Sequence, residues 1–238
     1  MRFIITLARF TAMVLTNAIM SSSGLLYLPF DRTGRYYFWV GSRWSMLSLW
    51  LCRIKVNARG LENIPANGNF ILVCNHASFF DIPAIMSIFP RARIMFKKEL
   101  SWIPLWGWAL RLGFHIAVDR GRGTKAMKSL DRAVKAIQAG GSVVLFAEGT
   151  RSRDGHLQPF KRGAFQLAAR TGVPILPIIL NGTFAIQPKE TFDIRPGTIE
   201  MIIGAPVPTA GITTRDGEIA LMAAVQDIFK KNFRYIAP

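Results

Sequence analysis

Cysteine and zinc-type ligand pairs are scarce in this chain of 238 residues. Only Cys52 and Cys74 occur, and both lie in apolar sequence, where a buried thiol is the usual outcome. The three histidines, His76, His115 and His156, are not paired with the cysteines at the spacing of a zinc site. We therefore expect no disulfide framework, no structural metal and no cofactor.

The motifs of several enzyme classes are also absent. The chain has no G-x-S-x-G turn to carry a serine nucleophile. It has no G-x-x-x-x-G-K-[ST] loop for ATP and no convincing G-x-G-x-x-G after a strand. Direct transfer remains, in which a base activates a hydroxyl to attack a ready-made electrophile.

Acidic residues are few: 14 Asp and Glu stand against 30 Lys and Arg, which gives a net charge of +16. A balance this basic favours polyanionic partners such as nucleic acid, anionic lipid or phosphorylated substrates. Hydrophobic residues make up 50% of the chain, which favours a membrane over nucleic acid. Because the chain lacks a basic-aromatic nucleic-acid module, we expect anionic membrane lipids as partners and no nucleic acid. A non-enzymatic basic membrane-binding protein is the alternative class.

The N-terminal region is almost uncharged. From Phe10 to Phe30 it carries no charged residue, and from Tyr36 to Leu51 it carries only Arg43. Each stretch approaches the roughly 20 residues that span a membrane, but basic residues at every junction suit a helical hairpin that dips into one leaflet. We predict a membrane-associated hairpin over residues 1–55 and a catalytic domain over residues 56–238. The alternative is a hydrophobic helix pair packed on a soluble domain.

Short apolar runs alternate with helical patterns after Lys55, which predicts an α/β fold. The residues after Arg215 predict a terminal helix whose inward face carries Ile219, Met222, Val225 and Phe229. The expected strands are 69–75, 92–96, 115–118, 142–147, 173–180 and 198–204.

The first expected strand ends in "ILVCNHASFFD", which sets an aspartate five residues after a histidine. Positions five apart lie about 140° from each other on a helix, so one straight helix would separate His76 from Asp81. A turn between the strand and a helix that begins near Ser78 would let the two side chains converge. The alternative is a surface histidine followed by a helix-capping aspartate.

Polar clusters follow two further strands. The strand in "GFHIAVDRGRG" leads to Asp119 and Arg120, and the strand in "SVVLFAEGTRSRDG" leads to Glu148 and Arg151. Because the carboxyl ends of strands line the ligand crevice of open α/β sheets, these clusters can share one site with the histidine. An imidazole that contacts a carboxylate can act as a general base. Arg120 and Arg151 suit a phosphate group, and Lys97 and Lys98 could join them. A salt-bridged turn at a strand end is the alternative for the Glu148 cluster.

These motifs also carry a resemblance. "NHASFFD" resembles the N-H-x-x-x-x-D block of glycerolipid acyltransferases, specifically the 1-acylglycerol-3-phosphate acyltransferase family. "GFHIAVDR", "FAEGTRS" and "VPILPIIL" resemble the second, third and fourth blocks of that family, in the same order, and the likeness covers roughly Ile71 to Leu180. One departure is Ala147, where the family usually shows Pro; no reactive group is affected.

The resemblance implies a mixed central sheet flanked by helices, with an N-terminal two-helix anchor. It implies transfer of a fatty acyl group from acyl-CoA or acyl carrier protein to the sn-2 hydroxyl of lysophosphatidic acid, forming phosphatidic acid. The enzyme would act at a membrane, on the cytoplasmic face of the inner membrane. Another lyso-lipid, such as a lyso-ornithine lipid or lysophosphatidylglycerol, is the alternative acceptor.

The expected roles follow from the chemistry of each group. His76 would take the hydroxyl proton, and Asp81 would fix the tautomer of the ring and stabilise the imidazolium. Arg151, with Lys97 and Arg120, would hold the acceptor phosphate. The substrate-binding residues that we expect are Lys97, Lys98, Arg120, Glu148, Gly149, Thr150 and Arg151.

Overall fold

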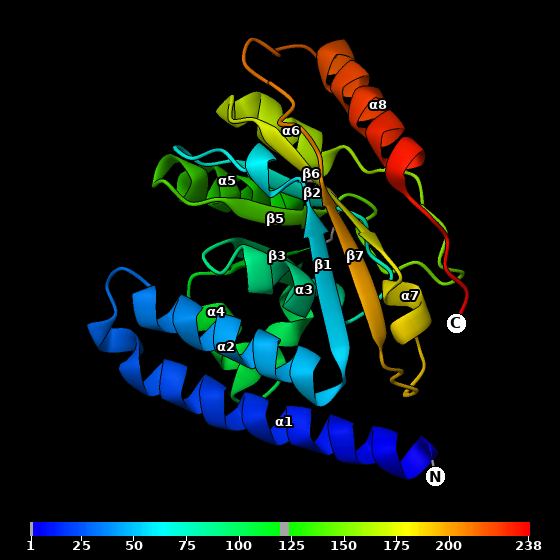
Figure 1. Cartoon of the computed structure of the whole chain (residues 1–238). Coiled ribbons are helices and arrows are strands. Elements are labelled where there is room, and N and C mark those ends of the chain that lie inside the picture. Colours follow the sequence, from blue (N-terminus) through cyan, green and yellow to red (C-terminus); the bar gives the residue numbers. More distant parts are fainter. Residues whose placement is uncertain (1, 120–123) are drawn as a thin grey trace.

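A computed structural model of the chain describes residues 2–119 and 124–238, and its centre is one sheet in the order β1-β7-β6-β2-β5-β3-β4 (Figure 1). Neighbouring strands are parallel except β6 and β7, which are antiparallel. The sheet is therefore mixed, and the predicted fold class is confirmed. The strands are β1 (Ile54–Arg59), β2 (Ile71–Cys74), β3 (Arg93–Lys97), β4 (Ile116–Val118), β5 (Val143–Phe146), β6 (Ile175–Asn181) and β7 (Gly197–Ile203).

Helices cover both faces of this sheet (Figure 1). One face packs against α1 (Arg2–Tyr27), α2 (Arg35–Leu51), α3 (Asp81–Ile88) and α4 (Trp106–Leu112), and the short helices η1 (Leu28–Phe30), η2 (Leu61–Asn63) and η3 (Lys98–Trp102) join these elements. The other face packs against α5 (Thr124–Gln138), α6 (Gly163–Thr171) and α8 (Arg215–Asn232), and α7 (Thr183–Ile186) follows β6.

The central strands are buried on both sides. In β2, Ile71 and Val73 join the hydrophobic cluster under α5, α6 and α8, whereas Leu72 and Cys74 join the cluster under α2 and α3. A strand covered on both faces needs apolar residues at every position, which explains the unbroken apolar run before the histidine.

Two details of the sequence interpretation need correction. The strand β1 was not predicted, although buried Ile54 alternates with exposed Lys55 in the period-two pattern of a half-covered edge strand. The inward position predicted for Ile219 is wrong, because this side chain is 41% exposed. The inward face of α8 carries Leu221, Val225 and Phe229, and Ile219 lies two residues, or about 200°, away from Leu221.

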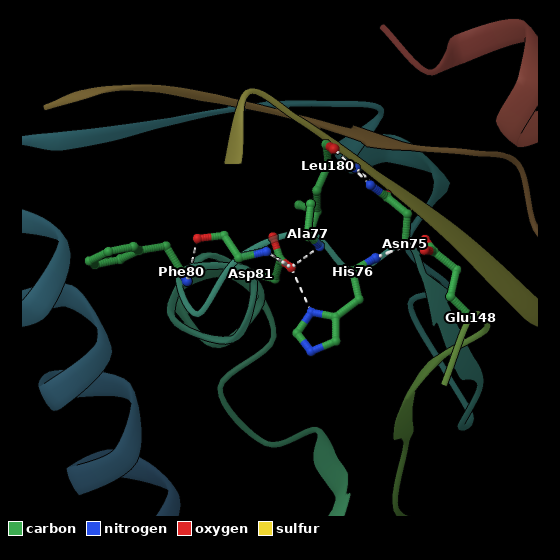
Figure 2. A network of polar contacts seen from close by, with 8 residues as sticks. Asn75, His76, Ala77, Phe80, Asp81, Glu148 and Leu180 are labelled. Atoms are coloured by element: carbon green, nitrogen blue, oxygen red, sulfur yellow. Dashed lines mark hydrogen bonds and ion pairs between the residues drawn. The ribbon is translucent and has the colours of Figure 1, made fainter. Parts of the chain in front are cut away.

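Two buried polar side chains tie the end of β2 to its neighbours (Figure 2). On one side, the amide of Asn75 donates to the Leu180 carbonyl at 2.9 Å and accepts from the Leu180 N–H at 2.8 Å. On the other side, Glu148 accepts a hydrogen bond from the His76 backbone N–H at 3.0 Å. The two residues that follow β2 are therefore held from opposite sides, Asn75 by β6 and His76 by the turn after β5.

Glu148 is 2% exposed, and its second carboxyl oxygen has no partner among the described residues. Burial raises the pKa of this carboxyl from 4.5 to about 8, although the backbone N–H of His76 and the hydrogen bond from Gln158 act in the opposite direction. Burial therefore favours the protonated form of Glu148 at neutral pH.

We predict that Asn75→Ala lowers the free energy of unfolding by about 2–5 kcal/mol, because the Leu180 N–H and carbonyl would be left buried without partners. Asn57→Ala, on the exposed side of β1, is the matched control and should change it by less than about 0.5 kcal/mol. Denaturant unfolding in detergent measures both, and equal losses in the two variants would contradict the role of Asn75.

The raised pKa of Glu148 predicts a pH dependence of stability. The folded protein binds a proton that the unfolded chain releases above pH 4.5, so this contribution is complete at low pH and is lost as the pH rises through about 8. As the pH rises from about 4.5 to about 8, the free energy of unfolding of wild-type protein should therefore fall more steeply than that of Glu148→Gln, by up to about 1.4 kcal/mol for each pH unit. Denaturant unfolding across the range tests this; Glu62→Gln, at an exposed carboxyl, should behave as wild type.

Candidate active site

The histidine and aspartate of the first motif are in contact. His76 Nδ1 lies 2.7 Å from Asp81 Oδ2, and the aspartate side chain is fully buried while 15% of the histidine side chain is exposed. The predicted convergence of the two groups is confirmed, and it arises as expected: β2 ends, a turn follows, and α3 begins at Asp81.

The aspartate also organises the turn between strand and helix. The same Oδ2 atom accepts hydrogen bonds from the backbone N–H groups of Ala77 at 2.8 Å and Ser78 at 2.9 Å (Figure 2). One oxygen thus receives three donors, which fixes the histidine side chain and the backbone that follows it. The helix-capping alternative is wrong, because α3 has Phe80 at its N-cap with no side-chain cap hydrogen bond, and the Asp81 carboxylate contacts the histidine and the preceding turn instead.

The imidazole ring is held in one orientation. Its face stacks on Phe146, with ring centroids 3.8 Å apart and planes 17° apart. Since a carboxylate only accepts hydrogen bonds, the contact with Asp81 places the ring proton on Nδ1 and leaves Nε2 of a neutral ring as an acceptor. In Figure 2 this second ring nitrogen points away from Asp81, as a general base that receives a substrate proton requires.

A cavity of about 390 Å³ opens beside the histidine. His76 and Arg151 contribute polar groups to its wall, and most other contributors are apolar. They come from α1, α2, α3, β3, η3 and α4, and include Met20, Phe38, Ile82, Phe96 and Leu110.

Arg151 reaches this cavity because its loop is tied to the histidine. The next residue, Ser152, donates its backbone N–H to the His76 carbonyl at 2.7 Å. The Ser152 hydroxyl lies 2.8 Å from the His156 carbonyl and 2.9 Å from a carboxylate oxygen of Asp154, which closes the loop behind the arginine. A base and a cation therefore share one wall of an apolar cavity.

The lysines expected at the phosphate lie at the same edge of the sheet but outside the wall of this cavity. Lys97 forms an exposed ion pair with Glu99 at 3.7 Å, and Lys98 lies 3.5 Å from Asp119. Arg120 lies outside the described residues.

The turn after β5 places the remaining predicted residues. Glu148 contacts the His76 backbone and, within the part of the chain that the structure describes, forms no ion pair. Gly149 adopts φ +70°, a conformation that favours glycine; a Cβ there would come within 3.0 Å only of the flexible end of the Lys161 side chain, so the constraint is conformation rather than space. Thr150 is half-buried in the same turn.

Sequence interpretation missed four contributors to the site. Asn75 and Ser152 are buried polar residues inside the motifs, and their place beside reactive residues was the available signal. Phe146 gave no signal, because an aromatic residue at a strand end is ordinary core sequence. His115 lines the far part of the cavity, and burial, then the nearby Arg93 charge, lowers its pKa to about 4, so it is neutral there.

Among the described residues, no group of three His, Cys, Asp or Glu side chains could hold a metal ion.

Comparison with known proteins identifies related chains. In Brassica napus, "1-acyl-sn-glycerol-3-phosphate acyltransferase BAT2, chloroplastic" is 36% identical over 183 residues, which cover 76% of this chain and 53% of the relative. The Pseudomonas aeruginosa protein named 1-acyl-sn-glycerol-3-phosphate acyltransferase is 36% identical over 189 residues, which cover 77% of this chain and 72% of the relative. The chain thus spans about half the length of the first of these relatives.

A solved structure has the same fold. The crystal structure of the 1-acyl-sn-glycerophosphate acyltransferase PlsC from Thermotoga maritima matches with a TM-score of 0.83 and 27% identity, and the match covers 97% of this chain and 93% of that one. Residues 55–181, which include β2, β5, His76, Asp81 and Arg151, match the family described as Acyltransferase. The chain belongs to the acyltransferase family.

Proposed function

We propose that this protein transfers a fatty acyl group from an acyl thioester to the sn-2 hydroxyl of 1-acylglycerol-3-phosphate, forming phosphatidic acid. The observation that carries the proposal is the His76–Asp81 contact of 2.7 Å at the wall of an apolar cavity that also contains Arg151. The names of the relatives from Brassica napus and Pseudomonas aeruginosa support this acceptor.

In the proposed reaction, Nε2 of His76 removes the proton of the acceptor hydroxyl as its oxygen attacks the thioester carbonyl. The new C–O bond forms and the C–S bond breaks, so the acyl group moves to the acceptor and the thiolate leaves. The imidazolium returns its proton to the thiolate. Asp81 stabilises the imidazolium while it exists, because its carboxylate is buried and already aligned with Nδ1.

The cavity suits an acyl chain. Its wall is mainly apolar and lies between the helices α1, α2 and α4, and His76 and Arg151 also line it. A chain in this cavity would present its polar end to the base. Arg151 would bind the phosphate of the acceptor, since a guanidinium forms paired hydrogen bonds with phosphate oxygens.

The surface of α1 supports action at a membrane. Apolar side chains point outward, with Ile4 and Ile19 each 69% and Leu26 77% exposed, while the polar Thr6 and Ser21 are buried against the protein. This arrangement is the reverse of a water-facing helix. Within the described residues, one segment, Phe3–Phe30, is long and apolar enough to cross a membrane.

The packing of α1 favours an orientation within one leaflet. The helix contacts α2 and α4 and lies side by side with α2 beneath the rest of the protein (Figure 1). A helix packed along the domain in this way would bring the cavity to the level of the lipid headgroups, where a lyso-lipid acceptor resides. We propose the cytoplasmic face of the membrane as the site of action, and anionic lipids as partners of the basic surface.

We predict that His76→Ala lowers turnover by about 10²- to 10⁴-fold, the usual loss when a general base is removed. The assay combines an acyl thioester with a panel of lyso-lipid acceptors and identifies the products by mass spectrometry. His156→Ala is the matched control, because this exposed histidine stacks on Tyr235 and lies outside the cavity wall. Near-full activity of the His76 variant, or preference for another acceptor, would contradict the proposal.

We predict that Arg151→Ala raises the KM for the acceptor by about 10- to 100-fold, because a charged hydrogen bond to phosphate is lost. The KM for the thioester should change much less. Arg59→Ala removes an exposed arginine on β1 and should leave both values unchanged. An equal rise of both KM values in the Arg151 variant would argue against a phosphate-binding role.

A further inference from the structure

A second hollow, unused by the proposed chemistry, runs along β4. This strand ends the sheet, so its outer edge has no neighbouring strand within the described residues. A groove of about 950 Å³ lies there, between η3 and α4 on one side and α5 on the other.

The groove is strongly basic. Among the described residues that line it, Asp119 is the one acidic residue, and it lies 3.5 Å from Lys98. Arg132 donates to the Ala117 carbonyl on β4, which holds a guanidinium over the strand edge. Of the other cations, none forms an ion pair with the described part of the chain. The cations are Arg93, Lys98, Arg111, Lys128, Arg132 and Lys135.

Aromatic surface accompanies this charge. Trp102 lines the groove and is 73% exposed. Phe114 also lines it, and the guanidinium of Arg93 lies over its ring at 5.9 Å from the centroid. An exposed ring such as that of Trp102 beside several cations is the combination that binds a nucleotide, because the base stacks on the ring while its phosphates contact the cations.

The groove is separate from the cavity that contains His76, but close to it. His115 lines both, and its ring packs against Tyr37 and Phe38. Because His115 is neutral, this aromatic wall divides an apolar space from a cationic one.

The groove also begins at the edge of the sheet where the chemistry is expected. Lys98 follows β3 and Asp119 follows β4, so both lie at the carboxyl ends of strands, as His76 does. In the sheet, β4 is three steps from β2, through β5 and β3, which is about 14 Å at ~4.8 Å for each step. An extended phosphopantetheine arm whose thioester lies at His76 can cover this distance.

We propose that this groove binds the phosphorylated nucleotide end of acyl-CoA, the donor in the reaction. The inference rests on the proposed function and assigns the donor carrier. The acyl chain occupies the apolar cavity, the pantetheine arm crosses the ends of β5 and β3, and the phosphates contact the cations along β4. Trp102 stacks on the adenine.

The placement of the cations distinguishes this ligand from a lipid headgroup. Lys128, Arg132 and Lys135 belong to α5, which covers the face of the sheet opposite to α1 (Figure 1). A membrane surface that follows α1 would lie a full sheet thickness from these side chains. A ligand that enters the groove reaches them directly.

The test uses the full chain with Lys128 and Lys135 both changed to alanine. Each is exposed on α5 and outside the cavity that contains His76. The KM for acyl-CoA should rise at least about tenfold, with kcat unchanged, because two charged contacts to phosphate are lost. The KM for the matching acyl-pantetheine thioester, which has no phosphate, should not change. The control removes Arg215 and Lys231 together, two exposed cations of α8.

A competition assay gives a second measurement. Adenosine 3′,5′-bisphosphate should inhibit wild-type protein competitively against acyl-CoA, and its inhibition constant should rise by about the same factor in the α5 double variant. An unchanged KM for acyl-CoA, or an equal rise for acyl-pantetheine, overturns the nucleotide site. A rise confined to acyl carrier protein as donor, or a loss of vesicle binding without a change in KM, overturns it in favour of a protein or a lipid ligand.

These failures are distinct from a failure of the proposed function. If wild-type protein transfers acyl groups from acyl-pantetheine and His76→Ala does not, the reaction stands whatever the groove binds. If wild-type protein transfers from no thioester to any lyso-lipid, the proposed function and the inference both fall.

Discussion

One buried oxygen of Asp81 accepts three hydrogen bonds, and the geometry of the site depends on them. Its donors are His76 Nδ1 and two backbone N–H groups of the turn, all within 2.9 Å. The carboxylate can make these contacts only because α3 begins at Asp81 directly after the turn. The orientation of the base and the path of the backbone therefore have the same cause, and a change at Asp81 would disturb both.

The sheet extends this constraint to the rest of the site. Since β2, β5, β3 and β4 are parallel, their carboxyl ends lie at one edge, and the residues after each strand meet there. Asn75 and Glu148 secure that edge with hydrogen bonds across neighbouring strands. When Glu148 is protonated, it accepts the hydrogen bond from His76 without placing a second negative charge beside the Asp81 carboxylate.

The sequence was sufficient for the features that depend on local spacing. The five-residue interval from His76 to Asp81 required a turn, and the apolar runs located the central strands to within about two residues of their ends. It was insufficient where a contact joins distant segments. The stacking of Phe146 on the imidazole and the position of Lys98 in the groove rather than in the cavity depend on strand order, which no single stretch of sequence contains.

The N-terminal helices show why a division by sequence pattern and a division by function can differ. The predicted boundary at Lys55 follows the change in composition and remains a prediction, but it falls on the second residue of β1. Residues on both sides of it line the cavity beside His76, among them Met20 and Phe38 on one side and Ile82 and Phe96 on the other. Because α1 turns apolar side chains to the outside and smaller polar ones toward the protein, the same helix can contact lipid and close the cavity. Membrane attachment and substrate binding would then share one element, so a change on α1 would affect both.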